Sequence, residues 1–226
     1  MKSQTGENVV RRGRAWAAAV LVLALIGASG WFYRYHVRDN IFPKNFGVVD
    51  EGKVYRAGGL TPAAFRAVAA EHGIKTFVDL GAWPAGSAED RRAQRTAEAL
   101  GVKRFRLELV GDGTGNPNHY VNTLRIMTDP ARQPVLVHCG AGSERTGIAV
   151  ILYRNLTLDT PIDEAYKETQ RYKHRPTRNP KLKEVLARFA EPILAAYRDG
   201  SSIVIPGEVE PVPVPKPVAD AAPAPR

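Results

Sequence analysis

One stretch of the chain combines residues whose types and spacing suit chemistry on a phosphate ester. It contains the only cysteine of the chain, Cys139, and five residues separate that cysteine from Arg145. The apolar residues 134–137 before it predict a buried strand, and the apolar run from position 146 predicts a buried helix. The loop between them holds Gly140 and Gly142, which can adopt positive φ angles. A strand, a tight loop and a helix start gather backbone N–H groups at the positive end of a helix dipole, which predicts a site for a phosphate dianion.

The side chains of this stretch have complementary chemical roles. The loop amides, the helix end and Arg145 all favour the thiolate of Cys139, which is the nucleophilic form. Arg145 offers a planar fork that can hold two phosphate oxygens. Thr146 offers a hydroxyl that can donate to the sulfur as it leaves a thiophosphate intermediate, and His138 is expected to support the loop by hydrogen bonding to backbone. The residues expected to bind substrate are Gly140, Ala141, Gly142, Ser143, Glu144 and Arg145.

The pattern His-Cys-x5-Arg-Thr-Gly at residues 138–147 resembles the signature of the cysteine-dependent protein tyrosine and dual-specificity phosphatase superfamily. The stretches 45–58 and 73–80 look like the opening of its small, atypical dual-specificity-like branch of bacterial type. The resemblance implies a phosphatase domain over residues 43–200 that hydrolyses phosphomonoesters with a cysteine thiolate, through a thiophosphate intermediate. It also implies that no metal or organic cofactor takes part, and the sequence has no His, Cys and Asp cluster with metal-ligand spacing.

Cleavage of a phosphate ester also needs a proton for the leaving oxygen. In the superfamily that the chain resembles, an aspartate on a loop before the cysteine supplies it. Residues 103–110 alternate in hydrophobicity as a strand does, and they lead into the glycine-rich residues 111–117. Asp112 is therefore the candidate for the acid of the first step and the base of the second. The alternative is that Asp112 only forms a turn, because Asp and Gly are common in turns.

Strands and helices alternate along residues 43–200, which predicts a three-layer α/β fold with helices on both sides of a mostly parallel central sheet. Ligands bind at the carboxyl ends of such strands, where both Cys139 and Asp112 are expected to lie. Strands are expected at 75–80, 103–110 and 135–138. Helices are expected at about 61–73, at 89–100, from 118, from 145, from 161, and from 180 to about 197.

The two ends of the chain differ in composition from its middle. Residues 15–33 contain no charged side chain and are long enough to span a bilayer, and the basic residues 1–14 precede them. We expect a single-pass transmembrane anchor there, with residues 43–200 on the extracytoplasmic (periplasmic) side. A cleaved signal peptide and topologies facing the cytosol are the alternatives. Residues 201–226 are rich in proline and predict a disordered or polyproline-like tail.

The charge of the chain bears on its partners. Residues 1–38 contain six Lys or Arg and one Glu, so much of the formal net charge of +9 belongs to the flanks of the apolar segment. The remainder is a modest positive field that attracts anionic substrates. The sequence has no basic stripe interleaved with aromatic residues, which argues against nucleic-acid binding. The expected partners are a phosphorylated protein or small phosphoester substrate and a membrane; an oligomeric state is not predicted.

The composition of the loop bears on the substrate. Phosphatases of the resembling superfamily that act on inositol phosphates or phosphoinositides tend to carry lysines in this loop. Here the loop has no base before Arg145 and includes Glu144, which repels added negative charge. This favours an ester with one phosphate, such as phosphotyrosine. A phospholipid or inositol-phosphate phosphatase and a catalytically silent phosphate-binding module are the alternatives. Residues that could form an anion-binding rim, or simply a solvated face, are His119, Lys173, His174, Arg175 and Arg178.

Overall fold

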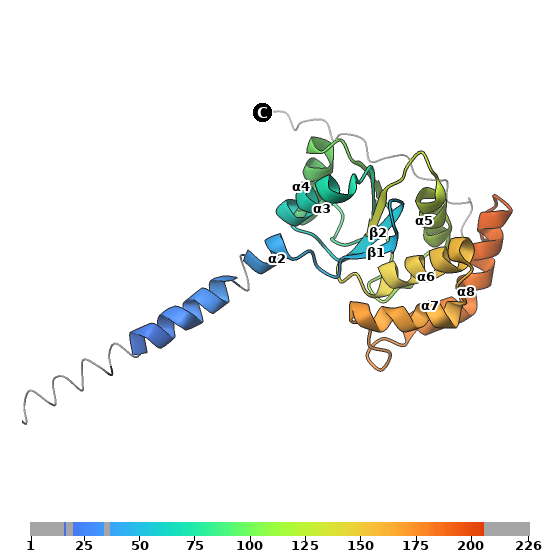
Figure 1. Cartoon of the computed structure of the whole chain (residues 1–226). Helices are drawn as coiled ribbons and strands as arrows, with labels where there is room; N and C mark the ends of the chain where they lie inside the picture. Colours follow the sequence, from blue (N-terminus) through green and yellow to red (C-terminus); the bar gives the residue numbers. More distant parts are fainter. Residues whose placement is uncertain (1–15, 17–19, 34–36, 206–226) are drawn as a thin grey trace, which may run out of the picture. The chain divides into compact units, whose positions relative to one another are not determined.

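Five short strands form one sheet in the computed structural model of the protein, which describes residue 16 and residues 20–33 and 37–205 (Figure 1). The strands are β1 (Gly47–Asp50), β2 (Val54–Ala57), β3 (Thr76–Asp79), β4 (Lys103–Arg106) and β5 (Val135–His138). Their order across the sheet is β1-β2-β5-β3-β4. β1 runs antiparallel to β2, whereas the pairs β2–β5, β5–β3 and β3–β4 are parallel. The predicted α/β class with a mostly parallel sheet is confirmed.

The central strand β5 shows how the sequence divides the sheet into two faces. Successive side chains of a strand point to opposite faces, so Val135 and Val137 lie in one hydrophobic cluster and Leu136 lies in the other. All four residues of β5 are buried, as expected for a strand that is covered on both sides. Helices cover both faces of the sheet, which gives three layers (Figure 1).

One face of the sheet is covered by α3 (Pro62–His72) and α4 (Ala88–Ala99). The start of α3 is fixed by Thr61, whose hydroxyl accepts a hydrogen bond of 3.2 Å from the N–H of Ala64. The helix ends at Gly73, which has a left-handed φ of 61°. This helix therefore begins and ends where its sequence signals predict.

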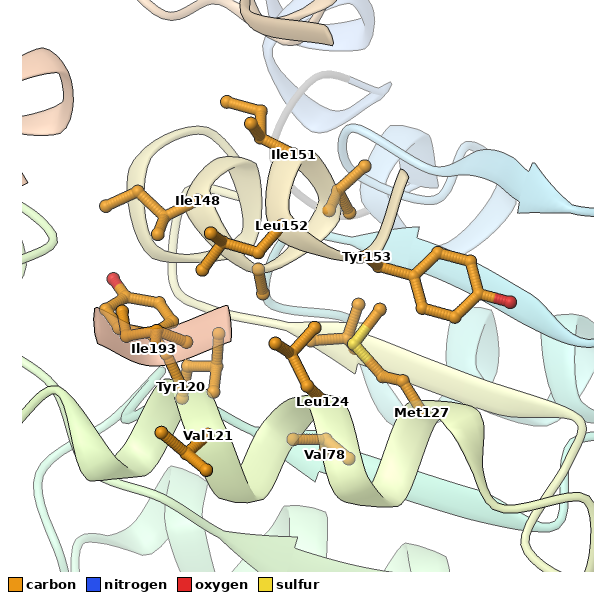
Figure 2. Close-up of a cluster of buried hydrophobic side chains, with 14 of the residues drawn as sticks. Val78, Tyr120, Val121, Leu124, Met127, Ile148, Ile151, Leu152, Tyr153 and Ile193 are labelled. Carbon is orange, nitrogen blue, oxygen red and sulfur yellow. The ribbon is translucent and has the colours of Figure 1, made fainter. Parts of the chain in front are cut away.

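The other face carries the larger hydrophobic core, which is built around α6 (Glu144–Leu158). This helix is buried from Arg145 to Tyr153, because the sheet and the helices around it contact it on several sides. Figure 2 shows Leu152 of this helix facing Leu124 of the facing helix, and Ile148 belongs to the same hydrophobic cluster. The packing fixes the first turn of α6, where the candidate phosphate loop ends. The elements of this layer are α5 (Asn118–Thr128), α6 (Glu144–Leu158), α7 (Ile162–Glu168), η2 (Thr169–Tyr172) and α8 (Lys181–Arg198).

The strand predicted over residues 103–110 is shorter than expected, because β4 ends at Arg106. Residues 107–110 still alternate between buried and exposed positions, which explains why their pattern is typical of a strand. Instead of continuing the ladder, the chain turns back: the N–H of Val110 donates to the carbonyl of Thr114 at 2.9 Å. The glycine-rich loop therefore begins to fold on itself before the predicted strand would end.

Residues 1–42 form a unit separate from residues 43–226. Within this first unit, residues 20–32 are helical and exposed, and α2 (Arg38–Ile41) follows. The segment 15–33, predicted to cross a membrane, falls only partly within the described residues, and the basic residues 1–14 fall outside them. Among the helices that the structure describes, none is both long and apolar enough to cross a bilayer.

The first residues of the predicted disordered tail are instead attached to the second unit. The N–H of Ile203 donates to Asn118 Oδ1 at 2.8 Å, and Asn118 Nδ2 donates back to the carbonyl of Ile203 at 2.9 Å. Ile203 also packs against the larger core. The prediction placed the tail too early, because the proline-rich composition begins only at Pro206. The predicted tail residues 206–226 lie outside the described residues.

Candidate active site

The loop between β5 and α6 has its carbonyl groups fixed by side chains that are distant in sequence. Lys44 Nζ donates to the carbonyl of residue 140 at 2.9 Å. Asn45 Nδ2 donates to the carbonyl of residue 141 at 2.9 Å, and Arg56 Nη2 donates to that of residue 142 at 2.8 Å. Three successive carbonyl groups of the loop are therefore held by the chain segment that leads into and includes β2.

The orientation of these carbonyls determines where the loop amides point. Because a trans peptide is planar, each carbonyl and the following N–H point in opposite directions. The N–H groups of residues 141–143 therefore point to the side away from the three donors. On that side the N–H of Gly142 donates to Cys139 Sγ at 3.2 Å. Together with the start of α6 at Glu144, the loop forms a concave nest of donors of the kind that binds oxyanions.

Gly142 is required by the close approach of two backbone segments. Its φ is 76°, and a Cβ atom there would lie 2.6 Å from the nitrogen of Gly58 and 2.8 Å from the carbonyl carbon and oxygen of Ala57. A Cβ atom on Gly58 would in turn lie 2.8 Å from the carbonyl oxygen of Ala141. Since backbone atoms cannot rotate away as side chains do, both glycines are needed for the loop to rest on the end of β2.

Cys139 lies at the floor of this nest and not on the molecular surface. The residue is only 1% exposed, and its sulfur receives the hydrogen bond from the loop amide described above. A phosphate would have to enter the nest of N–H groups in order to reach the sulfur. The same amides would then hold the phosphate oxygens and the nucleophile in one arrangement.

Arg145 is held in place by carbonyl groups from two neighbouring segments. Its Nη1 donates to the carbonyls of Leu80 at 2.8 Å and Leu109 at 3.2 Å, and also to that of Gly81. Its Nε is buried and has no hydrogen-bond partner within the described residues. The carbonyls therefore bind one side of the guanidinium and leave the Nε edge available for two oxygens of a phosphate.

Asp79, at the carboxyl end of β3, orients the turn that holds this guanidinium. Its Oδ1 accepts hydrogen bonds from the N–H groups of Gly81 at 2.9 Å and Ala82 at 2.7 Å. Burial opposes ionisation of the carboxyl, but attraction to His138 and Arg104 and the bond from Ala82 outweigh it and keep the pKa of Asp79 well below its usual value. Asp79 is therefore ionised, and it fixes the turn that begins at Leu80, whose carbonyl binds Arg145.

The expected hydrogen bonds from His138 to the loop backbone are wrong. Its Nε2 lies 3.5 Å from Asp79 Oδ1, and its ring stacks on Phe77 with ring centroids 4.1 Å apart. Neither ring nitrogen has a hydrogen-bond partner within the described part of the chain. The physical reason is the alternation of β5, which places His138 on the α3 side of the sheet, beside Asp79. The imidazole of His138 therefore lies beside the Asp79 carboxylate and not against the loop backbone.

Asp112 lies half-buried in the glycine-rich loop before α5. Hydrogen bonds from the hydroxyl and the N–H of Thr114, at 2.7 and 3.0 Å, hold the pKa of Asp112 below its usual value. The next residue, Gly113, accepts a hydrogen bond of 2.8 Å from the Tyr120 hydroxyl. Burial raises the pKa of Tyr120 well above its usual value, and the charges of Cys139 and Asp112 add to the effect. The structure therefore brings the Asp112 loop to the same end of the sheet as Cys139.

Glu144, which the sequence assigns to the substrate loop, is bound by a histidine. Its Oε2 lies 2.8 Å from Nδ1 of His174, and Nε2 of that histidine lies 3.0 Å from the hydroxyl of Tyr166. His174 is therefore buried against the loop and does not belong to an exposed anion-binding rim. His119 bonds the carbonyl of Glu108 through Nδ1 at 2.8 Å. The exposed members of the predicted rim are Lys173, Arg175 and Arg178.

Two further side chains of this stretch, those of Ser143 and Thr146, are buried, whereas Ala141 is exposed. Ser143 is 6% exposed and Thr146 is fully buried. Thr146 Oγ1 has no hydrogen-bond partner in the described ranges. Its hydroxyl can therefore donate to a group bound inside the site, and such a bond would remove the free-energy cost of an unpaired buried hydroxyl. The described residues contain no group of three or more His, Cys, Asp or Glu side chains that could hold a metal ion.

Four residues that organise the site were not assigned a role from the sequence. They are Lys44, Asn45 and Arg56, which hold the loop carbonyls, and Asp79, which holds the Gly81 turn. Asn45, Arg56 and Asp79 all lie in the two stretches, 45–58 and 73–80, that carry the resemblance outside the loop. That resemblance was the available signal for them, because their residue types alone do not indicate contact with the loop.

Comparison with known proteins agrees with this geometry. A family model described as the tyrosine phosphatase family matches residues 40–202, whereas no curated protein matches the chain. Among solved structures, the core catalytic domain of the PP-IP phosphatase SIW14 from S. cerevisiae is 21% identical with a TM-score of 0.54, and the match covers 70% of this chain and 94% of that chain. P. aeruginosa TpbA in complex with pTyr is 18% identical, with a TM-score of 0.56 over 69% of this chain and 91% of that chain. PTPMT1 is 19% identical, with a TM-score of 0.52 over 68% of this chain and 99% of that chain. These structures share the fold of this chain. Because the family match spans residues 40–202, most of the chain, the chain belongs to the tyrosine phosphatase family of cysteine-based phosphatases.

Proposed function

We propose that this phosphatase removes phosphate from proteins, with phosphotyrosine as the preferred ester, by a two-step mechanism through Cys139. The observation that carries the proposal is the nest itself: the N–H of Gly142 donates to the sulfur, and Arg145, in the first turn of the helix that follows the loop, is held by carbonyls while its Nε has no partner among the described residues. Such preorganised donors stabilise the charge of a transferring phosphoryl group without reorganising during the reaction.

In the first step the thiolate of Cys139 attacks phosphorus, the S–P bond forms and the bond from phosphorus to the ester oxygen breaks. Asp112 gives its proton to that departing oxygen. The Nε edge of Arg145 and the loop amides hold the non-bridging oxygens throughout the step. The product is a thiophosphate on the enzyme and the free alcohol or phenol.

In the second step Asp112 accepts a proton from a water molecule, whose oxygen bonds to phosphorus while the S–P bond breaks. The sulfur leaves as a thiolate, and the unpaired hydroxyl of Thr146 is available to donate to it. The N–H of Gly142 already donates to this sulfur at 3.2 Å. Both donors favour the thiolate leaving group, and the enzyme returns to its starting state with release of phosphate.

The preference for an ester with one phosphate rests on the charges at the loop. The intervening loop positions carry no base, and Glu144 adds a carboxylate, which lies 2.8 Å from Nδ1 of His174. Among the similar structures, TpbA is described in complex with pTyr, and SIW14 is described as a PP-IP phosphatase. The alternative is therefore an inositol-phosphate or phospholipid substrate.

A substrate panel tests this proposal. The full chain and Cys139→Ser would be compared on a phosphotyrosine peptide, a phosphoserine peptide, an inositol polyphosphate and a phosphatidylinositol phosphate. We expect the peptide with phosphotyrosine to be hydrolysed with the highest kcat/KM, and Cys139→Ser to be inactive on all four. Faster hydrolysis of the inositol or lipid substrate would favour the alternative, and vanadate binding without turnover of any ester would indicate a silent phosphate-binding module.

We further propose that residues 15–33 anchor the chain in a membrane and place the phosphatase domain in the periplasm. The support is the 19-residue stretch without a charged side chain and the stronger basic flank on its N-terminal side. A reporter enzyme that is active only outside the cytoplasm, fused after residue 205, should be active in cells. An active reporter on a protein shortened at its N-terminus would indicate a cleaved signal peptide, and an inactive reporter would contradict export.

A further inference from the structure

Arg56 of β2 lies beneath the phosphate loop and is buried almost completely, with an exposed fraction of 1%. Its Nη2 donates to the carbonyl of Gly142 at 2.8 Å. The N–H of the same glycine donates to Cys139 Sγ at 3.2 Å. A single loop residue therefore links the buried guanidinium to the nucleophilic sulfur.

The guanidinium of Arg56 keeps its charge at neutral pH. Burial is the main influence on it and lowers the pKa of Arg56 to about 10. Its Cζ lies 3.5 Å from the ring centroid of Tyr172, and its Nη1 lies 3.9 Å from Glu168. That carboxylate also binds Arg154 at 2.8 Å. One carboxylate shared by two guanidinium groups offsets only part of their charge, so the loop is left in a positive field.

We propose that Arg56 is a positioning residue for the phosphatase reaction, which fixes Gly142 at the floor of the nest and favours the thiolate of Cys139. This role rests on the proposed thiolate mechanism. Arg56 does not replace Arg145: it approaches the loop from the carbonyl side, whereas the phosphate would bind on the amide side. An arginine suits the position because a flat guanidinium can stack on the ring of Tyr172 and still donate to a carbonyl at its edge.

Other charged groups lie near the site, and the test must leave them intact. Arg145 and Glu144 belong to α6 and Asp112 to the glycine-rich loop; these three groups and Cys139 all interact electrostatically with Tyr120 of α5. On the far side of Arg56 the charged groups are Glu168 and Arg154. The effect of the Arg56 charge on the sulfur can therefore be distinguished from a general change of charge by a control variant at Arg154, which shares Glu168 with Arg56.

The experiment measures the pH dependence of alkylation of the sulfur by iodoacetamide in the full chain. Cys139 is the only cysteine, so the mass of the intact protein reports on this thiol alone. We expect Arg56→Gln to move the alkylation midpoint upward by about one pH unit, as for removal of a nearby opposite charge. The matched control is Arg154→Gln, which removes a charge beside Glu168 but no contact with the loop, and its midpoint should shift much less than that of Arg56→Gln. Arg56→Gln should also weaken vanadate binding.

An unchanged midpoint in folded Arg56→Gln, or an equal shift in Arg154→Gln, would overturn this assignment. If Arg56→Gln does not fold, as judged by circular dichroism, Arg56→Lys provides the test. Lysine keeps the charge but lacks the planar fork, so the midpoint should stay close to that of the wild type while vanadate binding weakens several-fold; wild-type vanadate affinity would refute the positioning role. The alkylation assay needs no substrate, so a chain that shows the expected midpoints but hydrolyses no phosphoester would contradict the proposed function, while the effect of Arg56 on the thiolate of Cys139 would stand.

Discussion

Replacement of Gly142 by alanine should damage both stability and activity, and a second glycine provides the control. Gly142 and Gly86 have similar left-handed φ angles, 76° and 71°. An added Cβ atom at Gly86 meets nothing within 4 Å, whereas at Gly142 it meets backbone atoms of residues 57 and 58 at 2.6 to 2.8 Å. Both variants therefore carry the strain of a left-handed residue, about 1 kcal/mol. Only Gly142→Ala adds an overlap with backbone, which costs a further 1–3 kcal/mol or so by analogy with overpacked cores.

Urea unfolding of the two variants measures this difference. Gly86→Ala should lower the free energy of unfolding by about 1 kcal/mol, and Gly142→Ala by about 2–4 kcal/mol when the overlap is included. Because the loop must move to relieve the overlap, kcat/KM of Gly142→Ala on p-nitrophenyl phosphate should fall by roughly 10²-fold, and that of Gly86→Ala should not change. Equal destabilisation of the two variants, with full activity of Gly142→Ala, would refute the argument that the loop rests on the end of β2.

Four further variants test other parts of the site. Asp112→Asn should lower kcat by roughly 10²–10⁴-fold on a phosphotyrosine peptide, and an unchanged kcat would assign the acid elsewhere. Thr114→Val removes the hydroxyl bond that lowers the pKa of Asp112, so the loss of activity at high pH should begin at a higher pH; a pH–rate profile identical to wild type would contradict this. Arg145→Lys cannot bind two oxygens bidentately and should lower kcat/KM by roughly 10²–10³-fold, as measured with the same peptide. Asp79→Asn should lower the free energy of unfolding by about 3 kcal/mol at neutral pH. Since the folded pKa of Asp79 lies far below the unfolded value of about 4, its stabilising effect is complete above about pH 4 and declines steadily as the pH falls further; a difference that is the same at about pH 6 and about pH 3 would argue against an ionised Asp79.

The parts of the site that are contiguous in sequence could be predicted. The loop around Cys139, its strand and its helix follow each other within a short segment, so local signals in the sequence were sufficient to place them. The carboxyl ends of parallel strands meet at one edge of the sheet, and that rule also brought Asp112 near the loop. The position of His138 could have been predicted more accurately from the same strand. Side chains alternate between the two faces of the sheet, so His138 lies on the face opposite to that of Val137, where α3 packs.

The supports of the loop could not be predicted, because strand pairing brings them from far away in the chain. Lys44 and Asn45 precede their carbonyl partners by 96 residues, and Arg56 precedes its partner by 86. A lysine or asparagine has no sequence pattern that indicates such a contact. His174 was misplaced for a related reason: its neighbours Lys173 and Arg175 suggested an exposed face, whereas its ring is buried against Glu144.

The long separation between the loop and its supports has a consequence for refolding. Turnover requires β2 to be docked beside β5, so a folding intermediate with helices and a collapsed core but without that pairing should be inactive. Long-range pairing of this kind is slow compared with local helix formation. After dilution from denaturant, catalytic activity should therefore return later than helical circular dichroism. The rate at which activity returns would then report the pairing of β2 with β5, the last step of folding.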